Sequence, residues 1–410
     1  MNPDPVAHVV LSLAIILVAA KCASHFAEWL GQSPVLGELV AGLVLGNLRL
    51  LGFSGLDYLK TDPSLDLLAG IGVILLLFEA GLGSTVGQMV KVGISAFLVA
   101  TLGVTGSFVL GWVAAALFLP GASAYVHAYL GAALTATSVG ISARVLKDLG
   151  RFQSNEARVI LGAAVVDDVL GLVILAVATG TITAINRGVA PSYAGIGMPL
   201  AKASLFLIGA LALGITLSPR LFMLASKLKT RGVLLAVGLA FCFLLSWLAD
   251  VLGLAPIVGA FAAGLILEDL HYRDFVDRGE HDLKELVAPI ASFLVPLFFA
   301  LMGIRTDLRS LAKPEVLGLA IGLTLAAVLG KQLSCFGVRA KGINRMSVGT
   351  GMIPRGEVEL IFANLGLTLT VAGERIVDQN IFSAIVAMVI LTAIVTPPAM
   401  KWSFERTKSP

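Results

Sequence analysis

Charged residues are scarce in this chain of 410 residues: they make up 13% of it, whereas hydrophobic residues make up 57%. A typical soluble domain has about 25% charged residues, so the composition lies far outside the globular range. The sequence also lacks segments of about 10 residues with strict apolar alternation, which a transmembrane barrel needs. Apolar runs of about 17 to 25 residues recur instead, the length with which an α-helix crosses hydrocarbon. The sequence therefore predicts an all-α polytopic membrane protein.

Cysteine and histidine are also rare. The three cysteines have no paired spacing, and the five histidines form no cluster with the spacing of metal ligands. A disulfide framework, a structural metal and a cofactor are therefore not expected. The formal net charge of +3 points to no nucleic acid and no soluble partner, which leaves membrane lipid as the expected surroundings.

The apolar runs divide into about 13 candidate transmembrane helices. Their approximate positions are 6–29, 34–51, 64–83, 92–118, 125–148, 157–180, 198–219, 231–251, 254–269, 285–304, 314–338, 345–373 and 379–400. The start of the chain has no basic region and no clear cleavage signature follows it, so the first run is expected to remain as a helix.

An odd number of spans places the two termini on opposite sides of the membrane. If the N-terminus is outside, 19 of the 29 basic residues fall in inner loops, the tail and the adjoining span ends. The positive-inside rule therefore favours an outer N-terminus and a cytoplasmic C-terminus in the plasma (inner) membrane.

Two pairs of spans indicate an internal repeat. The segments Pro34–Leu43 and Pro256–Leu265 share the pattern Pro-x-x-Gly followed by Ala-Gly-Leu, at an offset of 222 residues. Val73–Gly81 and Val295–Gly303 keep the same offset. Each span lies seven spans before its partner, so the copies have opposite orientations, as in many secondary transporters with a site near the midplane. Chance recurrence in glycine-rich membrane helices is the alternative.

Two adjacent aspartates, Asp167 and Asp168, lie inside the apolar run 162–176. A charge at the bilayer centre costs about 2.5 to 3.5 kcal/mol even on lenient scales, so the pair indicates an ion or proton site. Adjacent helix positions point about 100° apart, so one carboxylate can face a cavity while the other meets a protein partner. A poorly solvated carboxylate can take either a proton or a cation, and this competition is itself an exchange mechanism. A helix-end pair that reaches solvent is the alternative.

Two spans contain residues that interrupt helices. The run Leu134–Gly140 carries a cluster of hydroxyls, including those of Thr137 and Ser138, and ends in glycine. The run Gly351–Glu359 contains one proline, two glycines and three charges. We expect two discontinuous helices, whose half-helix ends and carbonyl oxygens are available to a cation. Small-residue packing is the alternative for the first run, and a loop end for the second.

Charged side chains in the later spans also need partners. Lys331 is the only lysine deep inside a span. Asp167 is its natural counter-charge if Asp168 stays available to the ion, and snorkelling to an interface is the alternative. Arg355 and Glu357 are expected to neutralise the dipole ends at the second break, and a pair between the two is a further option.

Taken in order, these residues resemble the monovalent cation:proton antiporter-2 family, of the sodium/proton exchanger type without a C-terminal regulatory domain. The elements that carry the resemblance are Pro34–Gly42, Val73–Gly81, Thr135–Ser138, Ala164–Gly171, Pro296–Phe299 with Gly303 and Asp307, Lys331, and Pro354–Glu357. They extend over nearly the whole chain, and their order is specific. One departure is Glu359, where the family commonly has glycine.

The resemblance implies a homodimer with two inverted repeats. A dimerisation unit would comprise approximately residues 1–85 and 198–305, and a mobile core unit that transports the ion approximately residues 90–180 and 314–400. No resident cofactor is implied, because the cations and protons are cargo.

The resemblance also assigns the site. By position in the motif, Asp168 would bind the transported cation and the proton, with Thr137 and Ser138 beside it, while Asp167 would be the partner of Lys331. In the family, an Asp-Asp pair with a lysine is associated with electrogenic exchange. Similar potassium efflux proteins often have Gln in place of the first aspartate and a nucleotide-binding C-terminal domain. Here Asp167 is present, and the sequence ends about ten residues after the last span.

The sequence therefore predicts a secondary antiporter, not an enzyme, that exchanges Na⁺ for protons by alternating access and serves pH homeostasis. Exchange of K⁺ for protons is the nearest alternative, and the choice among Na⁺, Li⁺ and K⁺ does not follow from the sequence. A cation channel would also use midplane carboxylates but would pass current without proton coupling. A membrane sensor that does not transport would show no flux.

Overall fold

Helices form almost all of the regular structure. The computed structural model describes residues 5–83, 93–186, 193–228, 230, 232–267, 281–339, 342–371 and 373–406. The helices of the first half are α1 (Pro5–Trp29), α2 (Pro34–Gly46), η1 (Leu48–Leu51), η2 (Asp57–Lys60), α3 (Pro63–Leu82), α5 (Gly93–Phe118), α6 (Ala124–Ala133), α7 (Val139–Asp148) and α8 (Asn155–Asn186). Those that follow are α9 (Tyr193–Ala225), α10 (Val233–Val251), α11 (Pro256–Ile266), α13 (Leu283–Arg305), α14 (Leu308–Leu311), α15 (Pro314–Gln332), η4 (Leu333–Gly337), α16 (Arg345–Gly351), α17 (Glu357–Gly366) and α18 (Gln379–Glu405). A short antiparallel hairpin joins β1 (Thr370–Val371) to β2 (Glu374–Arg375), with Thr370 opposite Arg375.

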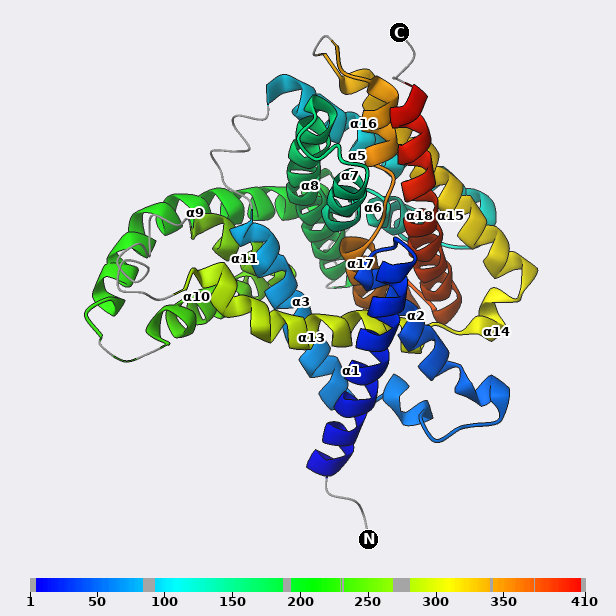
Figure 1. Ribbon diagram of the computed structural model, residues 1–410, viewed down its shortest axis with the longest axis horizontal. Helices are drawn as coiled ribbons and strands as arrows, with labels where there is room; N and C mark the ends of the chain where they lie inside the picture. Colours follow the sequence, from blue (N-terminus) through cyan, green and yellow to red (C-terminus); the bar gives the residue numbers. More distant parts are fainter. Residues whose placement is uncertain are drawn as a thin grey trace.

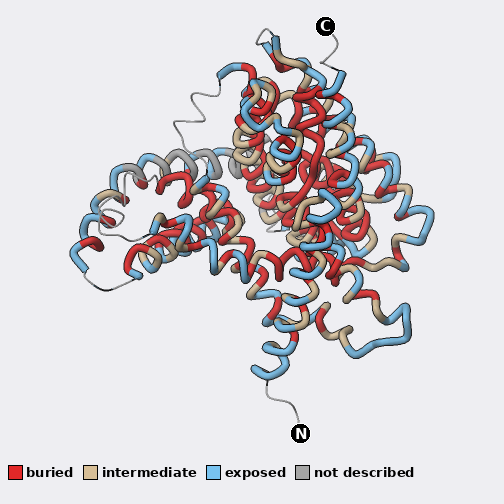
Figure 2. The backbone as a smooth tube through the Cα atoms, viewed as in Figure 1, coloured by how far each residue is buried: buried red, intermediate tan, exposed pale blue. Residues whose placement is uncertain are grey.

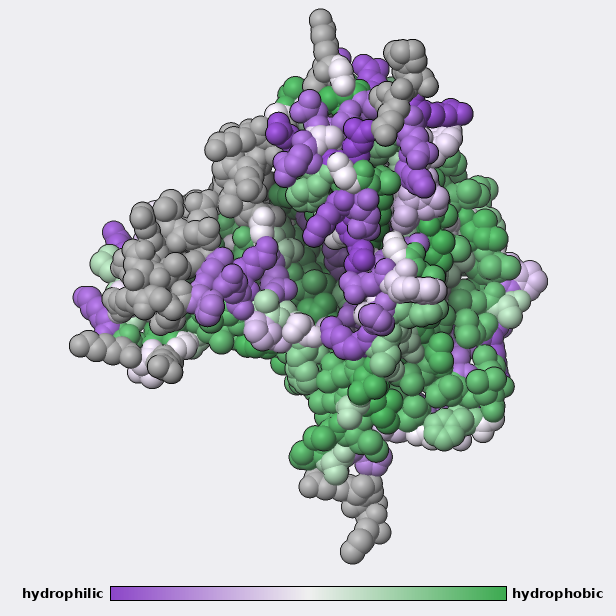
Figure 3. All heavy atoms as spheres, viewed as in Figure 1, coloured by the Kyte–Doolittle hydropathy of each residue, from purple (hydrophilic) through white to green (hydrophobic). Residues whose placement is uncertain are grey.

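The multi-span helical class predicted from the composition is confirmed. Among the described residues, eight helices are long and apolar enough to cross a membrane: α1, α3, α5, α8, α10, α13, α15 with its extension η4, and α18. Apolar side chains cover much of the face seen in Figure 3. The predicted spans fall on helices or on broken helices, but α2 and α11 are short, so the count of 13 crossings stays a prediction.

Two of the predicted spans end differently from the expectation. The span predicted at 34–51 is an α-helix only to Gly46, because the Asn47 side-chain amide donates to Leu43 O and to Thr306 O, both at 2.8 Å. The bond to Leu43 O satisfies a carbonyl that a longer helix would have paired, the bond to Thr306 O connects the end of α2 to the end of α13, and the chain continues as η1. The span predicted at 345–373 is interrupted after Gly351 and finishes in the β1–β2 hairpin.

The helices pack in two groups. The scaffold group comprises α1, α2, α3, α10, α11 and α13, and the core group comprises α5 to α8 with α15 to α18. Helix α9 packs on α8 of the core group and on α10 and α11 of the scaffold group. Figure 1 shows α1 beginning near the bottom of the molecule and α18 ending near the top. Buried backbone is densest inside the core group (Figure 2), which also carries Asp167, Asp168, Lys331 and Arg355.

The scaffold group contains two equivalent helix crossings. At the first, Gly42 of α2 meets Gly303 of α13 so closely that a Cβ on either glycine would overlap the backbone of the other helix. At the second, Gly264 of α11 meets Gly81 of α3 in the same way. The two crossings are related by the offset of 222 residues found in the sequence, so the repeat is also a repeat in packing.

In the structure, each copy of the repeat includes one more helix than the sequence pattern revealed. Gly37 of α2 packs against the backbone of Ala23 and Ser24 in α1, and Gly259 of α11 packs against Leu245 and Ser246 in α10. These contacts again differ by 222 residues. Because the residues of α1 and α10 that take part are mostly small or apolar and lack a shared motif, their relation was not visible in the sequence.

The glycine crossings predict a measurable difference between two similar substitutions. Gly303→Ala places a methyl group into the backbone of α2, and overpacking of this kind costs about 1 to 3 kcal/mol. Gly70→Ala, inside α3, meets no atom within 4 Å and should be neutral or slightly stabilising. Thermal unfolding of the purified protein in detergent should show a lower Tm for Gly303→Ala only. Equal Tm values for the two variants would contradict the close crossing.

Candidate functional site

Two interrupted helices cross in the middle of the core group. The break between α6 and α7 lies beside the break between α16 and α17: Ser138 N donates to Pro354 O at 2.9 Å, and Thr137 Oγ1 donates to Met352 O at 3.3 Å. A Cβ on Gly356 would come within 2.8 Å of the Ser138 side chain, so only glycine permits this approach. Irregular backbone at this depth is tolerated where it lines a site. Both predicted discontinuous helices are therefore present.

Proline and hydroxyl side chains explain why the helices stop here. Pro354 has no amide hydrogen and cannot continue the helical ladder of α16. Ser142, one turn into α7, donates to Gly351 O at 2.7 Å and so satisfies a carbonyl at the end of α16. Each half-helix thus receives partners from the other break, which offsets the polar groups that an interruption leaves open.

Arg355 fills the space where the breaks cross, with no exposed surface. Its guanidinium donates to Ala136 O, to Ser107 Oγ at 3.0 Å and to Ala327 O at 3.1 Å. The contact with Ala136 places a positive charge against carbonyls just beyond the end of α6, where a cation stabilises the helix dipole. The expected role of this arginine at a helix-dipole end stays a prediction.

The carboxylate nearest to Arg355 is Glu359, not Glu357. Glu359 Oε1 lies 3.8 Å from Arg355 Nη1, and its other oxygen accepts from Gly356 N at 2.8 Å. Arg355 precedes α17, which begins at Glu357, and the extended backbone at Gly356 brings the guanidinium to Glu359, while no ion pair forms between Arg355 and Glu357. From the sequence, Glu359 stood out only as a departure from the family.

Lys331 and Asp167 form a buried ion pair. Neither side chain has exposed surface, and Lys331 Nζ lies 2.9 Å and 2.7 Å from the two oxygens of Asp167. The lysine stem runs past α5 at Gly103, where a Cβ would come within 3.1 Å of it. The structure thus joins the two residues that the sequence analysis proposed as partners.

Asp168 has no such partner. It is partly exposed, and its Oδ1 is buried without a hydrogen bond from any described residue. The charged groups that act on it are the carboxylates of Glu357, Asp167 and Glu359 and the ammonium group of Lys331. Because Lys331 is held by Asp167, the surroundings of Asp168 are predominantly negative and favour a positively charged ligand.

Asp168 faces the crossing of the breaks. One turn further along α8, a Cβ on Gly171 would lie 3.4 Å from the Cβ of Ala136, which places this face of the helix against the first break. Glu357, which opens α17, accepts from Ser138 Oγ at 3.2 Å. Asp168 and Glu357 are both partly exposed, whereas Asp167 and Glu359 are buried.

The seven residues selected from the sequence are brought together inside the core group. Asp167 and Asp168 lie on α8, Lys331 on α15, and Thr137, Ser138, Arg355 and Glu357 at the two breaks. In the described part of the chain no three His, Cys, Asp or Glu side chains are placed to hold a metal ion. A cation beside Asp168 would therefore take further oxygens from hydroxyls, carbonyls or water, which hard cations accept. The roles of the single residues stay predictions.

An all-helical membrane protein with crossed broken helices beside buried carboxylates has the architecture of a secondary transporter. The family model described as the transmembrane sodium/hydrogen exchanger matches residues 8–406. The chain belongs to this family of monovalent cation:proton antiporters.

Several curated proteins are similar over nearly their whole length. The high-affinity Na⁺/H⁺ antiporter NhaS3 of Synechocystis sp. is 37% identical, over 99% of this chain and 92% of its own. The Na⁺/H⁺-K⁺ antiporter GerN of Bacillus cereus is 33% identical, over 96% of this chain and 95% of its own. The K⁺/H⁺ antiporter subunit KhtU of Bacillus subtilis is 28% identical, over 97% and 94%.

A solved structure supports the fold. The sodium proton antiporter MjNhaP1 from Methanocaldococcus jannaschii, determined at pH 8, superposes with a TM-score of 0.71. The comparison covers 98% of this chain and 99% of that one, at 16% sequence identity. At this identity the likeness extends to the helical architecture alone.

The buried ion pair predicts a stability difference. Lys331→Gln leaves Asp167 without its counter-charge, and removing one partner of a buried pair costs about 3 to 5 kcal/mol. The double variant Asp167→Asn with Lys331→Gln removes both charges and should recover most of the lost stability. Lys401→Gln, at an exposed position of α18, is the matched control. If Lys331→Gln unfolded at the same temperature as Lys401→Gln, the ion pair would make no measurable contribution to stability.

Proposed function

We propose that this protein is a secondary antiporter that exchanges a monovalent cation, Na⁺ in the first instance, for protons. The observation that carries the proposal is the unpaired carboxylate of Asp168 beside two crossed helix breaks. Membership of the sodium/hydrogen exchanger family supports the reaction class, and the similarity to the Na⁺/H⁺ antiporter NhaS3 supports Na⁺.

Competition for Asp168 couples the two ions. Protonated Asp168 offers no full negative charge to a cation, and cation-bound Asp168 has no free oxygen charge for a proton. The carboxylate therefore carries one cargo at a time. Hydroxyls of Thr137 and Ser138 and carbonyl oxygens of the breaks are the further ligands that we assign to the cation.

Access to Asp168 is one-sided, which supports alternating access. Towards the start of α8, Leu161 and Val165 lie on the same helix face as Asp168 and are partly exposed, while beyond it Leu172 is buried. On α7, Gly140 is exposed, and a Cβ there would meet nothing within 4 Å. On these exposures we assign the open side of the ion site to the α7 end and the closed side to the opposite end. With the C-terminus in the cytoplasm, this conformation faces inward.

The two helix groups suggest which parts move. We assign the core group, approximately residues 90–180 and 314–400, to carry the ion, and the scaffold group together with α9, approximately 1–85 and 198–305, to form the fixed dimer contact. The assignment rests on packing, since the site lies wholly within the core group. Location in the plasma (inner) membrane, a homodimer and a part in pH homeostasis belong to the same proposal.

Electrogenic exchange follows if more than one proton moves for each cation. The site holds four carboxylates, namely Asp167, Asp168, Glu357 and Glu359, but only two cations, Lys331 and Arg355. Two of the carboxylates are paired with these cations. The two carboxylates without a cation partner can together bind more than one positive charge, which supports an unequal exchange of ions.

Exchange of K⁺ for protons is the second candidate. It is favoured by the similarity to the Na⁺/H⁺-K⁺ antiporter GerN and the K⁺/H⁺ antiporter subunit KhtU. The Asp167–Lys331 pair leaves the same ligands to either cation, so flux measurements with each ion have to separate the two.

Reconstitution into liposomes tests the function directly. With a pH-sensitive dye inside, separate additions of Na⁺, K⁺ and Li⁺ should each report whether that cation drives proton movement. Asp168→Asn should reduce exchange to the background of empty liposomes, because the amide replaces the carboxylate that binds both the cation and the proton. Asp250→Asn, at an exposed position of α10, should keep it. Full exchange by Asp168→Asn would remove this site, and current without proton coupling would indicate a channel.

Competition also predicts the pH dependence. As pH falls, protons occupy Asp168 more of the time, so the apparent KM for Na⁺ should rise while the rate at saturating Na⁺ changes less. Initial rates measured over a range of Na⁺ concentrations at several pH values give both quantities. A constant KM with a falling maximal rate would show that the proton titrates a different group.

A further inference from the structure

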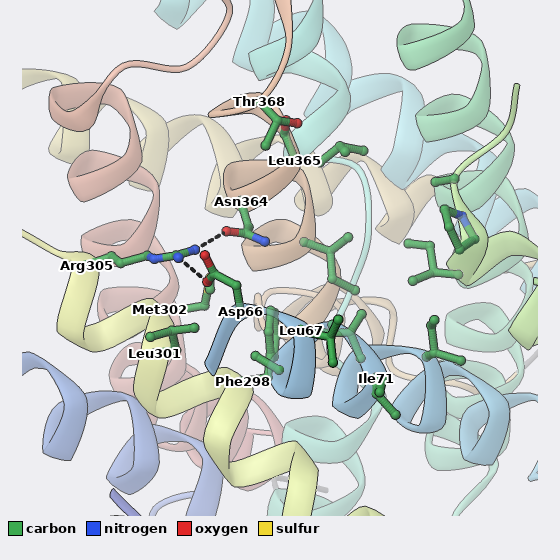
Figure 4. A pocket seen from close by; sticks show the side chains of 18 residues that line it. Asp66, Leu67, Ile71, Phe298, Leu301, Met302, Arg305, Asn364, Leu365 and Thr368 are labelled. Atoms are coloured by element: carbon green, nitrogen blue, oxygen red, sulfur yellow. Dashed lines mark hydrogen bonds and ion pairs between the residues drawn. The ribbon is translucent and has the colours of Figure 1, made fainter. Parts of the chain in front are cut away.

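A cavity lies between the scaffold group and the core group, away from Asp168. It has a volume of about 470 Å³ and is lined by α3, α11 and α13 on one side and by α17 on the other. Figure 4 shows its lining, with Asp66, Arg305 and Asn364 pointing toward one another at one end. Most of the remaining lining is apolar, so these polar side chains stand out.

Arg305, the last residue of α13, joins the two groups at this end. Its guanidinium donates to Asn364 Oδ1 of α17 at 2.9 Å and forms an ion pair with Asp66 of α3. Its Nε donates to Lys60 O at 3.3 Å, which also belongs to the scaffold side. The carbonyl of Arg305 accepts from the Gln379 side chain at the start of α18. One arginine thus contacts two helices of each group.

The cavity stops one helical turn short of the ion site. Ile361 lines the cavity and lies on the same face of α17 as Glu357, four residues earlier. One turn corresponds to a rise of about 5.4 Å. Ile361, Phe298 and Met302 are buried and line the cavity, so the side of the cavity that carries Ile361 is the one nearest to Glu357 along α17. The α7 end, which carries the exposed Gly140, is the end assigned above as open.

We propose that Asp66, Arg305 and Asn364 form a latch that holds α17 against α3 and α13 and keeps this end of the ion site closed. The cavity is the entrance through which Asp168 is reached after the latch releases and the core group shifts. The proposal rests on the proposed alternating access, for which it supplies the closing contact on the second side of the membrane.

The chemistry of the latch suits repeated opening. The side chain of Asp66 is 44% exposed and that of Arg305 is 15% exposed, so water can replace their contacts when the groups separate. An ion pair with access to water contributes little net stability, unlike the buried pair at Lys331. Among the contacts of Arg305, those with Asn364 and Gln379 cross between the groups, while the bond to Asp66 orients the arginine from the scaffold side.

A reversible cross-link tests the latch. In a protein without Cys22, Cys242 and Cys335, the pair Asp66→Cys and Asn364→Cys is joined with a short bifunctional thiol reagent that has a reducible link. Exchange in liposomes should stop on cross-linking and return after reduction. Absence of exchange even in the reduced, folded wild type would refute the proposed function itself. Continued exchange by fully cross-linked protein would refute the latch alone.

Labelling tests the same contact without any transport. Ile361→Cys is buried in the present conformation, so a membrane-impermeant maleimide added from the Asp66 side should react slowly. Arg305→Gln should raise the labelling rate several-fold, because the core group opens to this side more often. Arg309→Gln is the matched control: this arginine is exposed at the same end of the molecule, and no acidic side chain of the described residues forms an ion pair with it.

Two outcomes of the labelling decide the proposal. Faster reaction in Arg305→Gln than in Arg309→Gln, at equal Tm, supports the latch. Equal rates in the two variants overturn it. If Arg305→Gln does not fold, Asn364→Ala removes only the partner on α17 and gives the same comparison.

Discussion

The buried ion pair between Lys331 and Asp167 determines what the neighbouring carboxylate can do. Two short contacts commit the lysine to Asp167, and neither charge reaches solvent. Asp168, the next residue of α8, therefore has carboxylates around it and no cation of its own. A carboxylate in such surroundings is stabilised most by a proton or a cation that arrives from solution. The pair thus turns its neighbour into an acceptor, which is the property that an exchanger needs.

Charge balance also explains which carboxylates are accessible. Asp167 and Glu359 each have a cation partner and are buried, whereas Asp168 and Glu357 have none and are partly exposed. Burial of an unpaired charge is far costlier than burial of a pair, so the fold leaves the unpaired carboxylates at the edge of solvent. The lack of a cation partner thus explains why these two carboxylates are partly exposed. Arg355 contributes to this arrangement twice, because it balances Glu359 and also donates to the carbonyl of Ala136 between the half-helices.

Much of this arrangement was predictable from the sequence, for physical reasons. Charges inside apolar runs are rare enough to mark Asp167, Asp168 and Lys331, and Pro354 with its neighbouring glycines marks a break. The choice of partner for Arg355 was not settled, because it depends on where α17 begins, and helix ends are poorly fixed by sequence. The Arg305 latch was invisible because Asp66, Arg305 and Asn364 are far apart in the chain and meet only through the packing of α3, α13 and α17.

The strength of the ionic contacts differs between the inside of the core group and its boundary. The pairs at Lys331 and Arg355 lie within the core group and are buried, so they hold the site in one geometry. Contacts between the groups are partly exposed: Arg305 meets α17 at one end, and Arg144 of α7 meets Glu28 of α1 at 3.0 Å at another place. Exposed pairs add little stability, so neither position of the core group is strongly fixed by them. Where two conformations differ little in free energy, a ligand that binds one of them better can shift the balance. A rigid site within a loosely held core is therefore the arrangement that the proposed movement of the core group requires if occupation of Asp168 is to control it.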